Sequence, residues 1–152
     1  MVTRLQREYD KDFYAWILHN VALLRAGKLA KIDSEHVAEE LESMGKSDKR
    51  ELISRFAVLL AHLLKWKFQP ERRSTSWKNT IKTQRFDVSE LLEDSPSLKY
   101  ELDKQIEYAY EKALLFAINE TGLSQSTFPE TCPFSLSQCL DRDFFPDGKV
   151  AE

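Results

Sequence analysis

The sequence predicts an all-α protein: a single bundle of about five helices around a central helix near residues 48–68, followed by an irregular C-terminal wrap. Apolar residues in the central stretch recur at steps of four and three, which places them on one broad helix face. Only four of the 152 residues are glycine, whereas the helix-favouring residues alanine, leucine, glutamate and lysine are frequent. No alternating run of β-branched and aromatic residues is long enough to indicate a strand.

Two shorter helices are expected before the central one. The first is predicted to span residues 10–26, because an apolar stripe runs along it and Gly27 can adopt the left-handed conformation that ends helices. The second is predicted to begin at Asp33, a good N-cap, and to end at Gly45. Its apolar stripe is short, so it should cover little of the core.

The central helix should begin with Ser47 as its N-cap and end before Pro70, which lacks the N–H group that a helix interior requires. A fourth helix is expected over residues 76–93, where the four-three spacing returns. A fifth should span residues 95–121, opened by a Ser-Pro pair and ended by Gly122. These elements predict one bundle, with its core between about residues 9 and 123.

The C-terminal wrap, residues 124–146, differs in composition from the rest of the chain. Prolines punctuate it, and only residues 135–140 resemble a short helix. Several large apolar side chains in this segment would be costly in water, so we expect it to fold back over the bundle: Phe128, Phe134, Leu136 and Phe144. The chain is therefore predicted to be a single domain, residues 1–152.

The amino-acid composition indicates the class of protein and the cellular compartment to expect. Hydrophobic residues make up 42% and charged residues 31% of the chain, as in ordinary soluble globular proteins. No apolar run could span a bilayer and the N-terminus has no signal-like apolar core, so we expect a cytoplasmic protein with no membrane partner. In that compartment Cys132 and Cys139 should be reduced rather than joined.

Residues 65–85 form a basic edge, in which seven basic residues stand against a single acid although the net charge of the chain is -3. Tryptophan and phenylalanine are interleaved with the bases. Basic groups beside aromatic faces are typical of surfaces that bind nucleic acid or phosphate. The alternative is a solvated helix corner whose bases pair with acids on neighbouring helices. The candidate binding residues of the basic edge are Lys67, Arg72, Arg73, Lys78, Lys82, Arg85 and Trp77.

Arg55 and His62 are the candidate catalytic residues, together with Glu40. The first two are seven residues apart and therefore share one side of the central helix. The structural interpretation is a buried link from Glu40 to one of them, because an unpaired buried charge is costly. The catalytic interpretation is that this arginine–histidine pair resembles the pair of HEPN-type ribonucleases, all-α proteins that usually act as dimers. Here, however, Phe56 follows Arg55, where those enzymes commonly carry a polar residue.

A metal site is a further alternative. His36, Glu39 and Glu40 lie within one helical turn, and His62 could join them. A di-iron bundle needs two Glu-x-x-His pairs and further glutamates, and the sequence does not supply this pattern. We therefore expect neither a metal nor a cofactor.

Gln84 interrupts the apolar stripe of the fourth helix. A glutamine at such a position either forms a hydrogen bond to a neighbouring helix or lines a small polar pocket. Both interpretations remain open from the sequence.

Several blocks of the chain, between about Tyr9 and Pro146, resemble the domain of unknown function 29 family, which is bacterial and common in cyanobacteria. In order, they are YDKDFYAWILHNVALLRAG, EHVAEELESMG, LLAHLLKWKFQPERRSTSWKNTIKTQR, SPSL and ETGLSQSTFPETCPFSLSQCL. The resemblance implies a small, soluble, all-helical bacterial protein. It implies no established activity and supplies no catalytic residues.

The sequence therefore favours a non-enzymatic binding or interaction module, whose partner is another protein or a second copy of the chain. It contains no activated nucleophile, no paired catalytic carboxylates and no cofactor fingerprint. The alternative is a nucleic-acid-acting protein, such as a HEPN-like ribonuclease, that uses the basic edge with Arg55 and His62. The two hypotheses differ in whether that pair lies in an accessible cleft.

Overall fold

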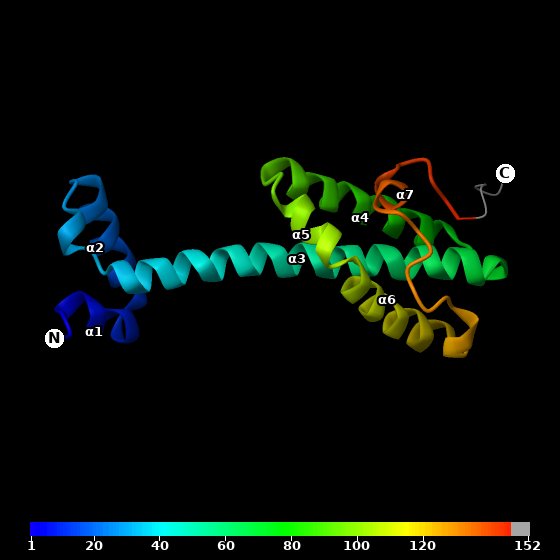
Figure 1. Cartoon of the computed structure of the whole chain (residues 1–152), viewed down its shortest axis with the longest axis horizontal. Helices are drawn as coiled ribbons and strands as arrows, with labels where there is room; N and C mark the ends of the chain where they lie inside the picture. The colour runs from blue at the N-terminus through cyan, green and yellow to red at the C-terminus, as the bar shows by residue number, and fades with distance from the viewer. Residues whose placement is uncertain (147–152) are drawn as a thin grey trace. The chain divides into compact units, whose positions relative to one another are not determined.

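The computed structural model describes residues 1–146, and within that range it contains α-helices and short 3₁₀ turns but no strand (Figure 1). The predicted all-α class is confirmed. The α-helices are α1 (Arg4–Lys11), α2 (Phe13–Arg25), α3 (Ser34–Phe68), α4 (Thr75–Asp94), α5 (Leu98–Lys104), α6 (Ile106–Thr121) and α7 (Leu136–Leu140).

Contacts between residues divide the chain into two compact units, Met1–Asp48 and Lys49–Glu152. We call them the N-terminal unit and the C-terminal unit, and each is described by itself. Helix α3 contributes residues to both. The single domain that the sequence suggests stays a prediction.

The N-terminal unit begins with two helices where the sequence predicts one. Asp12 separates α1 from α2, because its backbone is not helical and its side chain accepts a hydrogen bond from the Ala15 amide at 3.1 Å. Asp12 therefore caps α2. Helix α2 ends as predicted, with Gly27 in the left-handed conformation just beyond it (φ +73°).

A small polar core holds the N-terminal unit together. Its buried side chains are Trp16, Asn20 and Asp33. The indole Nε1 of Trp16 donates to Asp33 Oδ2 at 2.9 Å, and the Asp33 amide donates to Asn20 Oδ1 at 2.8 Å. Asp33 thus joins α2 to the beginning of α3.

Helix α3 is one continuous element of 35 residues, so the prediction of separate helices ending at Gly45 and starting at Ser47 was wrong. Gly45 does not adopt the positive φ of a helix-ending glycine. A glycine inside a helix costs only about 1 kcal/mol relative to alanine, and the neighbouring Glu, Met and Lys residues favour the helix. The end of α3 at Phe68, before Pro70, agrees with the prediction.

The C-terminal half of α3 is the centre of the hydrophobic core of the C-terminal unit, as predicted. The broad apolar face of this half is buried almost completely. Side chains of α4 and α6 complete the hydrophobic cluster. On α6 the core face consists of small residues that let helices approach closely: Ala109, Ala113 and Ala117 are fully buried.

Helices α4 to α6 differ in detail from the predictions. Helix α4 begins one residue earlier, because the Ser74 side chain accepts a hydrogen bond from the Trp77 amide at 3.1 Å. The single helix predicted over residues 95–121 is interrupted at Gln105 and forms α5 and α6. No glycine or proline marks that break. Gly122 ends α6 in the left-handed conformation, as predicted (φ +72°).

The C-terminal wrap covers the core, as its apolar residues predict. Phe128, Phe134 and Phe145 are at most 6% exposed and belong to the core cluster. Tyr110 of α6 donates its hydroxyl to the Pro129 carbonyl at 2.6 Å, which fixes the path of the wrap. The cysteines in this segment are both free thiols, as expected. Among the described residues, no helix combines the length and hydrophobicity that crossing a membrane requires.

Candidate functional site

Arg85 is a buried cation that connects α4 to the C-terminal wrap. Its side chain extends from α4, and the residue is only 2% exposed. Nε donates to the Cys139 carbonyl at 2.7 Å, and Nη2 donates to the carbonyls of Phe144 at 2.7 Å and Gln138 at 3.3 Å. Two of these acceptors lie at the C-terminal end of α7, where helix carbonyls carry partial negative charge. Arg85 therefore stabilises the fold of the wrap.

One donor of Arg85 is left over. Nη1 is buried and finds no hydrogen-bond partner among the described residues, 1–146. Burial lowers the pKa of Arg85, although Cys139, Asp141 and Asp143 oppose this electrostatically. A buried donor without an acceptor costs free energy, and the cost is greater on a charged group.

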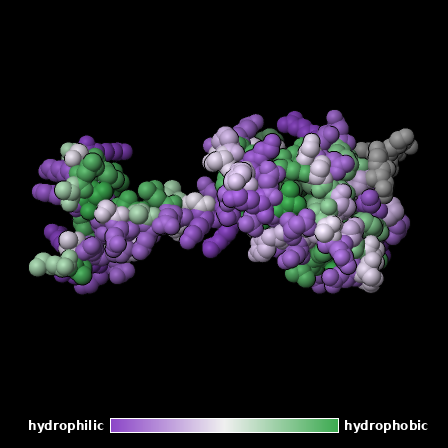
Figure 2. All heavy atoms as spheres, in the orientation of Figure 1, coloured by the Kyte–Doolittle hydropathy of each residue, from purple (hydrophilic) through white to green (hydrophobic). Residues whose placement is uncertain are grey.

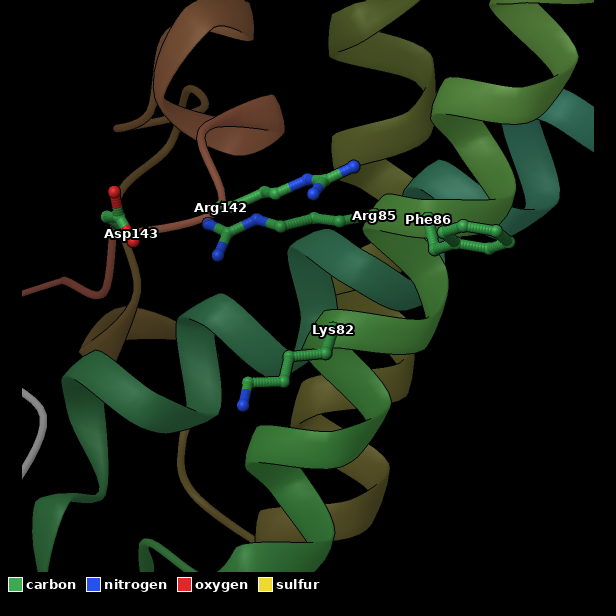
Figure 3. A pocket seen from close by; sticks show the side chains of 5 residues that line it. All are labelled: Lys82, Arg85, Phe86, Arg142 and Asp143. Atoms are coloured by element: carbon green, nitrogen blue, oxygen red, sulfur yellow. The ribbon is translucent and has the colours of Figure 1, made fainter.

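A cavity of about 330 Å³ lies beside this guanidinium (Figure 3). Its lining residues are Lys82, Arg85 and Phe86 from α4 and Arg142 and Asp143 from the wrap. Figure 3 shows the guanidinium of Arg85 directed toward the loop that carries Asp143. The volume is at the lower end of the range for small-molecule sites. We call this cavity the Arg85 pocket.

The lining of the Arg85 pocket is predominantly cationic. Three of its side chains carry a positive charge and one carries a negative charge. Within the described range, neither Lys82 nor Arg142 takes part in an ion pair. Phe86 is 57% exposed and also lines the pocket, although Figure 3 shows its ring directed away from the guanidinium of Arg85. This combination can bind an anionic group attached to an apolar body.

The structure distributes the residues of the basic edge over different environments. Lys65 is buried, and Arg73 donates Nε to the Trp66 carbonyl at 2.8 Å while its guanidinium lies over the Trp66 ring. Arg72 and Lys82 are exposed, whereas Lys67, Lys78 and Trp77 are half-buried. Only Lys82 and Arg85 of this set line the pocket. Nucleic-acid binding by the basic edge stays a prediction.

Arg55 and His62 each have their own partners. Arg55 donates to Glu51 at 2.9 Å and to Asp87 at 2.8 Å. His62 Nδ1 lies 3.0 Å from the Val58 carbonyl one turn earlier, and burial lowers the pKa of His62.

The predicted link from Glu40 to Arg55 or His62 was wrong. All three residues belong to α3, so the packing of two separate helices on which that link depended does not exist. Glu40 instead accepts a hydrogen bond from the Tyr9 hydroxyl at 2.6 Å.

His36 takes part in a chain of polar contacts in the N-terminal unit. Its Nδ1 lies 2.6 Å from Asp33 Oδ2, and its ring stacks on that of Tyr9 with centroids 3.9 Å apart. The hydrogen bond to Asp33 raises the pKa of His36. Burial alone would raise the pKa of Asp33, but hydrogen bonds from Trp16 and His36 outweigh it and lower that pKa.

The candidate metal ligands do not form a cluster. Glu39 is exposed, Glu40 is bonded to Tyr9, and His36 is bonded to Asp33. Among residues 1–146 there is no group of three or more His, Cys, Asp or Glu residues that could hold a metal ion.

A family model described as Domain of unknown function DUF29 matches residues 8–145, well over half of the chain. The chain belongs to the DUF29 family. The family suggested by the sequence blocks is thereby confirmed. Neither the curated proteins nor the solved structures contain a match to this DUF29 chain.

Gln84 of the DUF29 chain lines a polar hollow rather than bonding a neighbouring helix. The other lining residues of this hollow also come from α4 and are Ser76, Asn79, Thr80 and Thr83. Gln84 Oε1 is buried and, in the part of the chain that the structure describes, lacks a hydrogen-bond partner. The hollow is uncharged, so it offers a ligand less binding energy than the Arg85 pocket does.

Sequence reasoning missed Phe86, Arg142 and Asp143 of the Arg85 pocket. It treated the basic edge as a continuous segment, whereas the pocket combines α4 with a loop more than fifty residues later. The one available signal was Arg142 itself, an arginine in a wrap predicted to fold over the bundle. It also missed Asp33 as the partner of His36, although their i, i+3 spacing is visible in the sequence.

Proposed function

We propose that this DUF29 chain is a non-enzymatic binding module of the bacterial cytoplasm, and that its ligand is a phosphate monoester with an aromatic or apolar body, held in the Arg85 pocket. The observation that carries the proposal is the cationic lining of the pocket, to which Lys82, Arg85 and Arg142 each contribute a positive charge. Arginine binds phosphate oxygens with charge-assisted hydrogen bonds that are stronger than neutral ones.

The charge of the pocket supports a doubly charged ligand. Lys82, Arg85 and Arg142 outnumber the single carboxylate of Asp143 by two, and a phosphate monoester carries close to two negative charges at neutral pH. The exposed ring of Phe86 can contact the organic part of the ligand. No nucleophile with an adjacent base lines the pocket, which favours binding without reaction.

Calorimetric titration with phenyl phosphate at low salt tests the proposal. We expect measurable binding that weakens as salt is added, and no binding of the uncharged analogue phenol. Lys82→Ala and Arg142→Ala should each weaken binding by roughly tenfold, the loss of one charge-assisted contact. Lys99→Ala, at an exposed lysine of α5, is the matched control and should leave affinity unchanged.

Two results would refute the proposal: no binding of phenyl phosphate at millimolar concentration, or equal affinity in the Lys82→Ala/Arg142→Ala double variant. Arg85→Ala is unsuitable as the main test, because Arg85 also stabilises the wrap. Binding of inorganic phosphate with the same affinity as phenyl phosphate would refute the part assigned to Phe86.

Nucleic-acid binding has less support. Several bases of the basic edge are engaged in the fold, and the hydrogen bonds of Arg55 and His62 explain both residues without catalysis. A labelled single-stranded oligonucleotide in the same buffer tests this alternative. Salt-sensitive binding that Arg72→Ala abolishes and phenyl phosphate does not displace would favour it.

A further inference from the structure

Helix α2 leaves a row of large apolar side chains exposed on the surface of the N-terminal unit. Its buried residues, Trp16 and Asn20, lie on one side. Next to that side, at 100° per residue, an arc of roughly 140° contains only apolar residues between Phe13 and Leu24. The exposed members of this arc are Phe13, Tyr14, Leu18, Val21 and Leu24, each between 36% and 70% exposed.

Hydrophobic residues gather over the N-terminal unit around α2 in Figure 2. The five side chains of the arc present roughly 400–500 Å² of exposed surface, on the scale of about 150–250 Å² for a whole aromatic side chain. One partner in a standard protein interface contributes about 800 Å², somewhat more than half of it apolar. The arc therefore supplies the apolar area that one half of a stable interface needs.

A protein surface that covers this arc must itself be apolar along the whole length of the helix. Between Phe13 and Leu24 the helix carries no Asp, Glu, Lys or Arg, and His19 is bonded to Glu8 at 2.6 Å. A second α2 meets this requirement, because it presents the same apolar arc over the same length of about 20 Å. Twofold symmetric pairing of identical patches is the commonest form of protein assembly.

Charges at the two ends of α2 specify the direction of such a pair. Asp10 and Asp12 precede the helix on either side of Lys11, whereas Arg25 is its last residue and Lys28 and Lys31 follow it. An antiparallel pair places the basic end of each helix beside the acidic start of the other. It also opposes the two helix dipoles, which a parallel pair would align.

We propose that α2 is the interface of a homodimer, in which the α2 helices of two copies pack antiparallel through this apolar arc. The dimer does not depend on ligand binding at the Arg85 pocket. It requires a second copy of the same chain and no other partner.

Sedimentation equilibrium over micromolar concentrations of the full chain tests this proposal. We expect a dimer for the natural sequence and a monomer for Leu18→Glu, which places a charge in the arc about halfway along the helix. The matched control is Leu115→Glu, at an exposed leucine of α6 in the C-terminal unit, and it should remain dimeric. Far-UV circular dichroism must show equal helix content in all three proteins.

Cysteine pairs test the direction. For an antiparallel pair centred near residue 19, Tyr14→Cys and Leu24→Cys chains should form a disulfide when mixed under a mild oxidant, and neither should cross-link to itself. The natural sequence is the control for Cys132 and Cys139. A monomeric natural chain, or a Leu18→Glu variant that is still a dimer, overturns the proposal. Self-cross-linking of Tyr14→Cys overturns the antiparallel arrangement.

Discussion

The ammonium of Lys65 lies 2.7 Å from a carboxylate oxygen of Glu120, which joins the end of α3 to the end of α6. Lys65 is only 5% exposed, and the ring of Trp77 faces its charge at 4.7 Å. A residue whose sequence context suggests a binding surface thus forms part of the core. Its charge is tolerated there because both neighbours compensate for lost hydration.

Glu120→Ala should therefore lower the free energy of unfolding by about 1–3 kcal/mol, because it leaves the charge of Lys65 without its carboxylate. Glu111→Ala, at an exposed position of the same helix, is the control and should cost less than about 0.5 kcal/mol. Urea denaturation of both variants measures the difference. Equal midpoints would show that Lys65 does not need Glu120.

Leu60 is fully buried at the centre of the α3 core. Leu60→Ala should cost about 2–5 kcal/mol, because removing a buried side chain leaves a cavity that the neighbouring helices fill only in part. Leu115→Ala, at a leucine that is 68% exposed, should have little effect. A melting curve of Leu60→Ala that matches the natural sequence would contradict the assignment of this helix as the core.

The sequence predicted the core of the C-terminal unit well, because hydrophobic spacing directly reports which helix face is buried. It predicted helix ends less well. Gly45 predicts a helix end, but a glycine ends a helix only where the chain needs a positive φ, and the flanking residues here favour continuation. Gln105 shows the opposite error, since an ordinary residue interrupts a helix there.

The candidate site could be predicted only in part. Lys82 and Arg85 were identified because a cluster of bases beside aromatic residues is visible in one segment. Arg142 was not, because its proximity to α4 depends on how the wrap returns over the bundle. Spacing along one helix cannot reveal contacts between segments that are distant in sequence.

Tyr9 and Glu40 form a short hydrogen bond that raises the pKa of Tyr9 to about 12. Glu40→Gln should lower the pKa of Tyr9 toward the ordinary tyrosine value of 10.0, because it removes the negative charge that opposes ionisation. Ultraviolet titration, compared with Tyr9→Phe to identify the signal, measures this. Glu39→Gln is the control and should shift the pKa far less, since Glu39 acts only through space.

The pair of His36 and Asp33 should make the N-terminal unit more stable at mildly acidic pH. The pKa of His36 is raised above its ordinary value of 6.5 by Asp33, so its contribution is complete below pH 6.5 and is lost as pH rises through the raised value. The pKa of Asp33 is lowered, so this residue stays ionised throughout that window. Hydrogen exchange of the α2 amides should therefore show more protection near pH 5.5 than near pH 8.5, after correction for intrinsic rates.

His36→Gln should remove most of that pH dependence. His62 provides a comparison of opposite sign in the C-terminal unit. Burial lowers the pKa of His62, so its environment costs stability as pH falls below 6.5. Protection of α2 that increases with pH, or that is unchanged in His36→Gln, would contradict the importance of the Asp33 contact.

The three hydrogen bonds from Arg85 to the wrap predict how the wrap can be released. Arg85→Met keeps most of the length of the side chain but removes every donor, so the carbonyls of Cys139 and Phe144 lose their partner. Limited proteolysis should then cut the wrap at least several-fold faster, because protease cleavage follows the population of the opened segment.

Arg142→Met, at an exposed arginine of the wrap, is the matched control and should leave the cleavage rate unchanged. Arg85→Lys should fall between the natural sequence and Arg85→Met, since one ammonium cannot reproduce the fork of a guanidinium. Equal cleavage rates in all four proteins would mean that the apolar contacts of Phe128, Phe134 and Phe145 hold the wrap without Arg85.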